Sequence, residues 1–232
     1  DVTRSAHNPF DNGYLSGQFD GDDYLTLPTT SEHDFGTGDF TVEFFVYPRE
    51  ALGGHMFLSA PQNTTTQLGY DTGNGPRYLY FYNGANIISG TGAGSLVAFE
   101  WNHVVLVREG TTLSLFSNGN RVGTATHNSN VSLSGLNIGR YHAGGWDMKS
   151  LISNLRIVKG SALYNPSNST YTTPTSPLTT TSQGATASEV KLLTCQSSNF
   201  VDNSNTLVKV LEAGNANTRP LFPFANTTIP QQ

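Results

Sequence analysis

The stretch from Trp101 to Ala125, WNHVVLVREGTTLSLFSNGNRVGTA, decides the fold class of this 232-residue chain. Residues 102–108 are apolar on both faces, which is typical of a central strand of a sheet. A turn then leads into residues 113–116, and Asn118-Gly119 predicts a tight second turn because both residues tolerate positive φ. Residues 121–125 return as the second strand of that hairpin. The stretch therefore predicts consecutive antiparallel strands.

The rest of the chain extends this β pattern in both directions. Residues 41–47 place Val42, Phe44 and Val46 on one face, and residues 77–82 end at a second Asn-Gly turn. Charged residues make up only 12% of the chain while Gly numbers 24, a composition that favours short strands and turns over helices. Cys195 is the single cysteine, so it cannot form an intrachain disulfide, and we expect it to be a small buried hydrophobe.

Composition also excludes two classes of partner. The formal net charge is −5, which gives no electrostatic footprint for nucleic acid. The sequence has no run of 18 apolar residues, so we expect no membrane span. We therefore expect neither a nucleic acid nor a membrane among the partners.

Several segments resemble laminin-G-like domains. The family's opening strands are matched by residues 19–27 (FDGDDYLTL) and residues 35–44 (FGTGDFTVEF). Its hairpin is matched by Trp101-Asn102-His103-Val104 with residues 113–119, and a closing strand by residues 151–157 (LISNLRI). The resemblance covers residues 17–165 and implies a concanavalin A-like antiparallel β-sandwich, or jelly roll.

We predict the following organisation, with the C-terminal strands completing the sandwich. An alternative for residues 189–224 is the start of a truncated repeat, but a lone strand pair buries too little surface to be stable. The predicted segments are an N-terminal arm (1–16), the laminin-G-like β-sandwich (17–165), a Thr/Ser/Pro connector (166–188), C-terminal strands packing on the same sandwich (189–224) and a tail (225–232).

Several glycoside hydrolases share the fold that this resemblance implies, and their catalytic acids follow a recognisable pattern. Retaining members carry two glutamates on one strand face, about 5 Å apart. Glu43 stands alone between Val42 and Phe44, and no other glutamate has an acid partner at strand spacing. We therefore expect no enzymatic activity and assign no catalytic residues.

Two kinds of binding site remain. Asp20, Asp22 and Asp23 surround a glycine and are candidate Ca²⁺ ligands, with Asp39 or Asp147 as a further ligand from a second loop; the alternative is that Asp20 caps a turn while its neighbours face solvent. Calcium is the one cofactor considered. Sugar sites stack an aromatic ring beside polar groups. The glycan-binding candidates are Tyr141, His142, Trp146, Asp147, Tyr70 and Asp71.

Residues 156–164, 174–179, 191–197 and 200–204 resemble laminin-G-like modules in structural proteins of tailed bacteriophages, particularly marine ones, and in large bacterial surface proteins. This resemblance implies a non-catalytic virion structural or adhesion module: a head decoration, fibre or tail-associated protein on the particle surface. Its partners would be other virion proteins, sister subunits of a homo-oligomer and a host surface glycan. The alternative is a carbohydrate-binding, lectin-like module of a bacterial surface or secreted protein.

Overall fold

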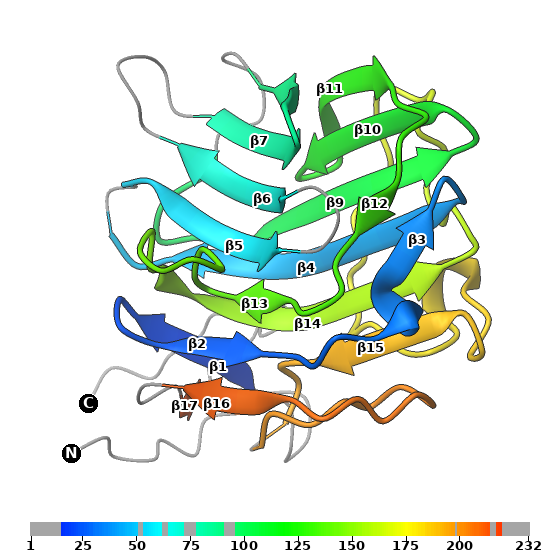
Figure 1. Cartoon of the computed structure of the whole chain (residues 1–232). Helices are drawn as coiled ribbons and strands as arrows, with labels where there is room; N and C mark the ends of the chain where they lie inside the picture. The colour runs from blue at the N-terminus through cyan, green and yellow to red at the C-terminus, as the bar shows by residue number, and fades with distance from the viewer. Residues whose placement is uncertain are drawn as a thin grey trace.

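The computed structural model describes residues 15–50, 53–61, 65–71, 78–90, 96–197, 199–213 and 217–219. The tail 225–232 and residues 1–14 of the predicted N-terminal arm lie outside these ranges. The described part is a sandwich of two antiparallel sheets, sheet A and sheet B (Figure 1). The predicted all-β antiparallel sandwich is thus confirmed. Among the described residues, no helix is long and apolar enough to cross a membrane.

Sheet A contains the stretch that decided the fold class. Its central strand β9 lies between β10 and β4, and the β10–β11 turn has positive φ at both Asn118 and Gly119, as predicted. In spatial order, the strands are β11 (Asn120–Thr126), β10 (Thr112–Ser117), β9 (Asn102–Glu109), β4 (Phe40–Pro48), β14 (Lys149–Lys159), β1 (Ser16–Asp20) and β17 (Asn217–Arg219), with β15 (Val190–Thr194) beside β1 on the same edge of β14.

Sheet B packs face to face with sheet A. Its strands, in spatial order, are β16 (Leu211–Ala213), β2 (Tyr24–Thr26), β13 (Asn137–Ile138), β5 (His55–Ala60), β6 (Thr66–Asp71), β7 (Tyr78–Asn83) and β8 (Asn86–Ser89). A separate small ladder joins β3 (Asp34–Gly36) to β12 (Val131–Ser132). Two 3₁₀ turns, η1 (Ser31–His33) and η2 (Ser182–Gly184), lie in connections.

One apolar core fills the space between the sheets. Alternation along each strand supplies it, because successive side chains of a strand point to opposite faces. Val42, Phe44 and Val46 of β4 are fully buried in this core, as the sequence predicts. The C-terminal strands belong to the same sandwich, since β15 pairs with β14, β16 with β2 and β17 with β1. Cys195 is buried in the core, as expected.

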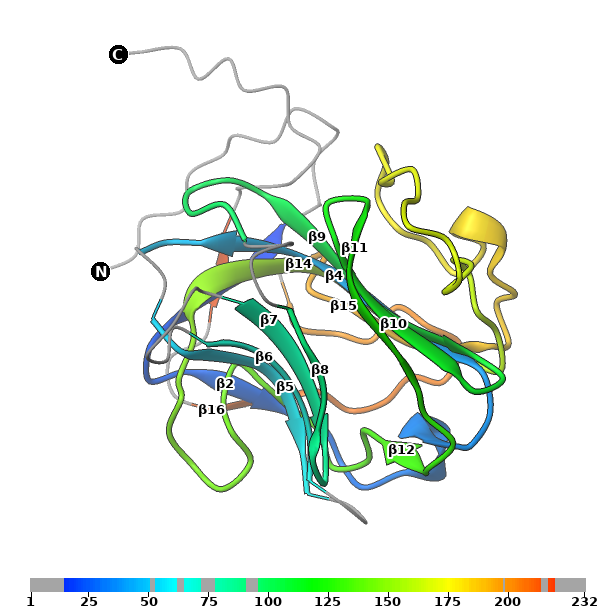
Figure 2. The ribbon, with the colours of Figure 1, turned by 90° about the horizontal axis from the view of Figure 1, so that it is seen from above.

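The outer face of sheet A is covered by the chain itself. Residues 160–189, which we call the strap, cross this face on the side away from sheet B (Figure 2). Outward-facing side chains of sheet A, such as Phe45 and Val105, are buried against strap residues. The strap residues in these two apolar clusters are Ala162, Leu163, Tyr164, Tyr171, Leu178 and Ala185.

Candidate functional site

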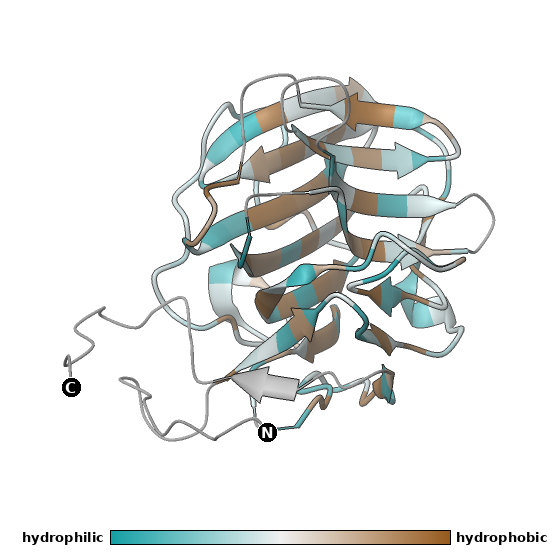
Figure 3. Cartoon of the chain, turned by 90° about the vertical axis from the view of Figure 1, so that its left-hand side faces the viewer, coloured by the Kyte–Doolittle hydropathy of each residue, from teal (hydrophilic) through white to brown (hydrophobic). Residues whose placement is uncertain are grey.

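Most of the predicted binding residues lie at one end of the sandwich, which faces the viewer in Figure 3. The turn 20–23 follows β1, residues 49–50 and 53–54 lie between β4 and β5, and the loop 139–148 joins β13 to β14. Backbone hydrogen bonds connect them: Arg49 N donates to the Lys149 carbonyl (3.2 Å) and Met56 N to the Trp146 carbonyl (3.1 Å). We call this region, together with His55, Asp71 and Lys149 at the adjoining ends of β5, β6 and β14, the loop end.

Trp146 is the most exposed aromatic side chain of the loop 139–148, with 49% of its surface accessible. Its ring lies against Gly54, where a Cβ atom would come within 2.9 Å of the Trp146 Cζ3. The absence of a side chain at Gly54 therefore lets the ring approach the backbone. Trp146 has a φ of 57°, an uncommon left-handed conformation for a bulky residue, and such conformations cluster at functional sites.

Asp147, the next residue in the chain, pairs with a cation of the same loop. Asp147 Oδ1 lies 2.9 Å from Arg140 Nε, and the Arg140 guanidinium lies 5.0 Å above the centre of the Tyr24 ring. The Arg140–Asp147 contact is an ion pair without the alignment of a hydrogen bond. Sequence reasoning missed Arg140 and Tyr24, because only the fold brings β2 next to the loop.

Tyr141 and His142 form the other part of this loop. Their ring centres are 4.3 Å apart, and both side chains are partly exposed. The His142 backbone N–H donates to Ser59 Oγ at 3.2 Å, and His142 Nδ1 is 2.9 Å from the same hydroxyl. The loop is thereby attached to the outer face of β5. Burial lowers the pKa of His142, so its imidazole is neutral at neutral pH.

Tyr70 does not belong to this surface, and its prediction as a glycan contact needs correction. Its side chain has no accessible surface and lies in the core with Leu68, because residues two apart on a strand share a face. The period-2 rule applied to Leu68 could have given this result. Asp71 points to the other face and remains partly exposed at the loop end.

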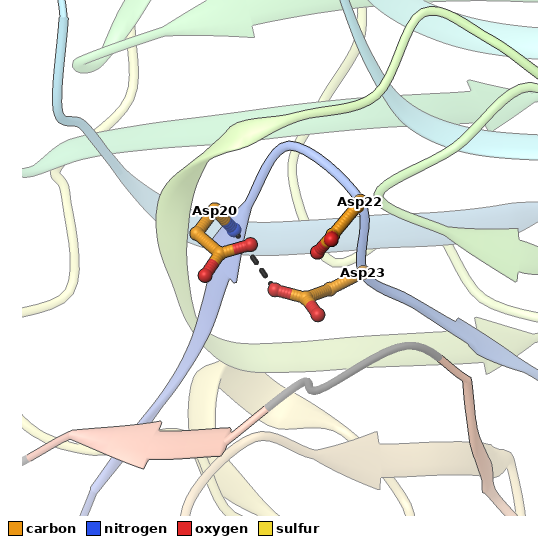
Figure 4. A group of neighbouring side chains, drawn as sticks. All are labelled: Asp20, Asp22 and Asp23. Carbon is orange, nitrogen blue, oxygen red and sulfur yellow. Dashed lines mark hydrogen bonds between the residues drawn. The ribbon is translucent and has the colours of Figure 1, made fainter. Parts of the chain in front are cut away.

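The turn 20–23 brings its three carboxylates together, with oxygens within 4.8 Å of one another (Figure 4). Asp20 and Asp22 are exposed, while Asp23 is buried and accepts a hydrogen bond from the Asp20 N–H (3.0 Å). Asp39 cannot add a ligand, because it lies at the opposite end of β4, where it accepts from Gly110 N. Three carboxylates that each supply one oxygen fall short of the six to eight oxygens that Ca²⁺ takes, so backbone carbonyls, waters or a second loop would have to complete the shell.

A second cluster of ionisable groups lies beneath the strap. Glu43 of β4 has no accessible surface, and its Oε1 accepts from Arg156 Nε (3.0 Å) and Nη2 (2.6 Å). Its Oε2 accepts from the Tyr164 hydroxyl (2.7 Å) and lies 3.2 Å from His103 Nε2. We place the imidazole proton on Nε2, since it faces a carboxylate, which leaves Nδ1 to accept from the Tyr171 hydroxyl at 2.6 Å.

These contacts join sheet A to the strap. Arg156 Nη1 donates to the carbonyls of Thr179 (2.6 Å) and Ser182 (3.0 Å). Burial raises the pKa of Glu43, but the hydrogen bond from His103 and the charge of Arg156 together lower it by more. The net pKa therefore lies below its ordinary value. The carboxylate is therefore ionised and fully paired. A ligand cannot reach it while the strap is in place.

The fold and the loop end define the class: a sandwich of two antiparallel β-sheets with aromatic side chains in the loops at one end. Residues 19–163 match the family model described as the concanavalin A-like lectin/glucanases superfamily, and the chain belongs to that superfamily. The laminin-G-like and concanavalin A-like resemblance of the sequence is thereby confirmed. A comparison with curated protein sequences finds no match.

Solved structures with this fold include proteins of several organisms. A candidate carbohydrate-binding protein from Bacteroides ovatus has a TM-score of 0.64 at 15% identity, and the match covers 90% of this chain and 60% of that one. The heptameric SAP-like pentraxin from Limulus polyphemus has a TM-score of 0.53 at 16% identity, covering 89% and 94%. Domain 4 of AbnA, an extracellular arabinanase from Geobacillus stearothermophilus in complex with arabinotriose, has 0.50 at 16%, covering 72% and 83%. At these identities the likeness establishes the fold alone.

Proposed function

We propose that this chain is a carbohydrate-binding, lectin-like module that binds its glycan at the loop end. The observation that carries the proposal is Trp146, a half-exposed indole that lies against Gly54 and is followed in the chain by Asp147, the partner of Arg140. Protein sugar sites combine such an aromatic surface with polar groups that orient the hydroxyls. The descriptions of the Bacteroides and Geobacillus structures, which refer to carbohydrate binding and to arabinotriose, support the same class of ligand.

Binding of an oligosaccharide array by the full chain tests this function, followed by calorimetry with the best ligand. We expect Trp146→Ala to weaken binding about tenfold, because truncating an aromatic anchor costs about 1.4 kcal/mol or more. Tyr82→Ala is the matched control, since Tyr82 is a partly exposed aromatic near the far end of β7. Unchanged affinity in Trp146→Ala would place the site elsewhere, and a wild-type chain that binds no glycan would refute the function.

We further propose that the module acts without catalysis. The Glu43 side chain points to the outer face of sheet A, where its two oxygens already contact Arg156, His103 and Tyr164. A general acid or a nucleophile must contact the substrate. The strap separates Glu43 from solvent, which supports a binding role. Calcium at the turn 20–23 stays a prediction.

The virion role also stays a prediction, together with its particle location and its virion partners. Packing accounts for the residues that motivated it: Arg156 pairs with Glu43, and Asp202 accepts from the Leu193 N–H at 2.9 Å. These segments therefore maintain the sandwich, and their resemblance to phage modules follows from shared structure as readily as from shared location. Mass spectrometry of purified particles, with the copy number of this chain, tests the role directly.

A further inference from the structure

The charges of the loop end indicate which glycans it accepts. Its described residues carry more carboxylates than cations, and the cations are Arg49, Arg140 and Lys149. The carboxylates are Asp20, Asp22, Asp23, Glu50, Asp71 and Asp147. The described part of this end thus has an excess of three negative charges.

Two of the three cations are already paired within the protein. Arg140 binds Asp147 at 2.9 Å, and Lys149 Nζ lies 3.5 Å from Glu50 Oε2. The Lys149 side chain also packs along the turn 20–23, because a Cβ atom at Gly21 would lie 2.7 Å from the Lys149 Cε. An acidic ligand would have to compete with these carboxylates for Arg140 and for Lys149.

The two histidines of the loop end do not change this balance. His55 is buried, and burial lowers its pKa despite the neighbouring Glu50 carboxylate at 3.8 Å. His142 has a lowered pKa for the same reason. Both imidazoles are therefore neutral at neutral pH and add no positive charge.

The acidic groups lie close enough to Trp146 to act on its ligand. Asp147 follows it in the chain, and Tyr24, next to Asp23, packs against Arg140 of the same loop. On the neighbouring strand, Tyr70 pairs with His55, which follows Gly54 in the chain, and Gly54 lies against the Trp146 ring. Asp71 is the next residue after Tyr70 and therefore lies near the same ring. In water, charges within about 10 Å still interact appreciably when the ionic strength is low.

We infer that the loop end selects uncharged saccharides and discriminates against those that carry carboxylate, sulfate or phosphate groups. The inference rests on the proposed function and specifies its ligand class. Three excess charges acting over about 10 Å predict that an acidic glycan binds about fourfold more weakly than its neutral counterpart at about 0.01 M ionic strength. The difference should vanish at about 1 M salt, where screening is nearly complete.

The test is an array in which each neutral oligosaccharide is paired with its sialylated, uronic-acid or sulfated counterpart, probed with the full chain in chelator at low and high salt. Asp22→Lys should reduce the discrimination to about 1.6-fold, because it cancels two of the three excess charges and the remaining one contributes a third of the energy. Glu109→Lys is the control, as it makes the same charge change at the opposite end of β9.

The outcomes separate the two proposals. Preference for the neutral member of each bound pair, lost in high salt and reduced in Asp22→Lys, supports the inference. Equal or tighter binding of the acidic members overturns the inference and leaves glycan binding intact. An equal effect of Glu109→Lys overturns it too, because the discrimination would then come from the charge of the whole protein. A chain that binds neither member refutes the proposed function itself.

Discussion

Glu43→Gln should destabilise the protein strongly, because Glu43 is the centre of the buried cluster that joins sheet A to the strap. The substitution preserves the shape of the side chain but removes the negative charge facing Arg156, which has no accessible surface. Breaking a buried ion pair by changing one partner costs about 3–5 kcal/mol, since the remaining charge is left uncompensated. In a protein of this size, that corresponds to a fall in Tm of roughly 6–20 °C.

Urea denaturation at neutral pH measures this loss, and limited proteolysis detects any release of the strap. Glu109→Gln at the exposed end of β9 is the control and should change the free energy of unfolding by less than about 0.5 kcal/mol. If Glu43→Gln stays within about 1 kcal/mol of wild type, the buried charge is not paired as described. In the double variant with Arg156→Met, the loss should be less than the sum of the two single losses by about 1–3 kcal/mol.

The same cluster gives a pH dependence whose sign is fixed by the lowered pKa of Glu43. Unfolding returns this carboxyl to its ordinary pKa of 4.5. The stabilisation from its ionised form is therefore fully present above that pH, and it is lost as the pH falls through the lower folded-state pKa. The stability difference between wild type and Glu43→Gln should accordingly shrink on acidification below pH 4.5.

Two further predictions concern single positions. Gly54→Ala should displace the Trp146 ring, since the new Cβ would lie 2.9 Å from Cζ3. In a Trp101→Phe background, the indole fluorescence should shift and the glycan affinity should fall. Unchanged values of both would contradict the contact between Gly54 and Trp146. Burial raises the pKa of the Cys195 thiol to about 12, so a thiol-specific reagent should react with it at neutral pH only after unfolding, and rapid labelling of the native protein would contradict its burial.

The sheets were predictable because their signals are local. Residues 102–125 carry both the apolar pattern of a central strand and the Asn-Gly turn, and the observed β9, β10 and β11 follow them closely. Trp146 was also within reach, since small residues around an aromatic in a loop favour its exposure. The prediction failed at Tyr70. Its nearness to a loop suggested an exposed side chain, whereas its spacing of two residues from Leu68 places it on the core-facing side of the strand.

The strap and its cluster could not be derived in the same way. Glu43 and Arg156 are separated by 113 positions, and each alone is merely a charged residue inside an apolar strand. Only the antiparallel register of β4 and β14 makes them partners. The Thr/Ser/Pro composition of residues 166–188 predicts an extended path but does not specify the surface that the path covers. Long-range pairing, unlike turn chemistry, has no signature in a single sequence.

The outer face of sheet A and the loop end have different roles: the first stabilises the fold, and the second is the proposed binding surface. A sandwich of this fold offers an outer sheet face and loop-bearing ends as sites for ligands. Here the strap occupies the sheet A face, and the buried Glu43–Arg156 pair helps to hold it there: Arg156 contacts Glu43 on one side and strap carbonyls on the other. An acid committed to such a contact cannot also protonate a glycosidic oxygen. Glu43→Gln can therefore be assayed for glycan binding as well as for stability. If releasing the strap left binding at Trp146 unchanged, stability and recognition would be physically separate in this module.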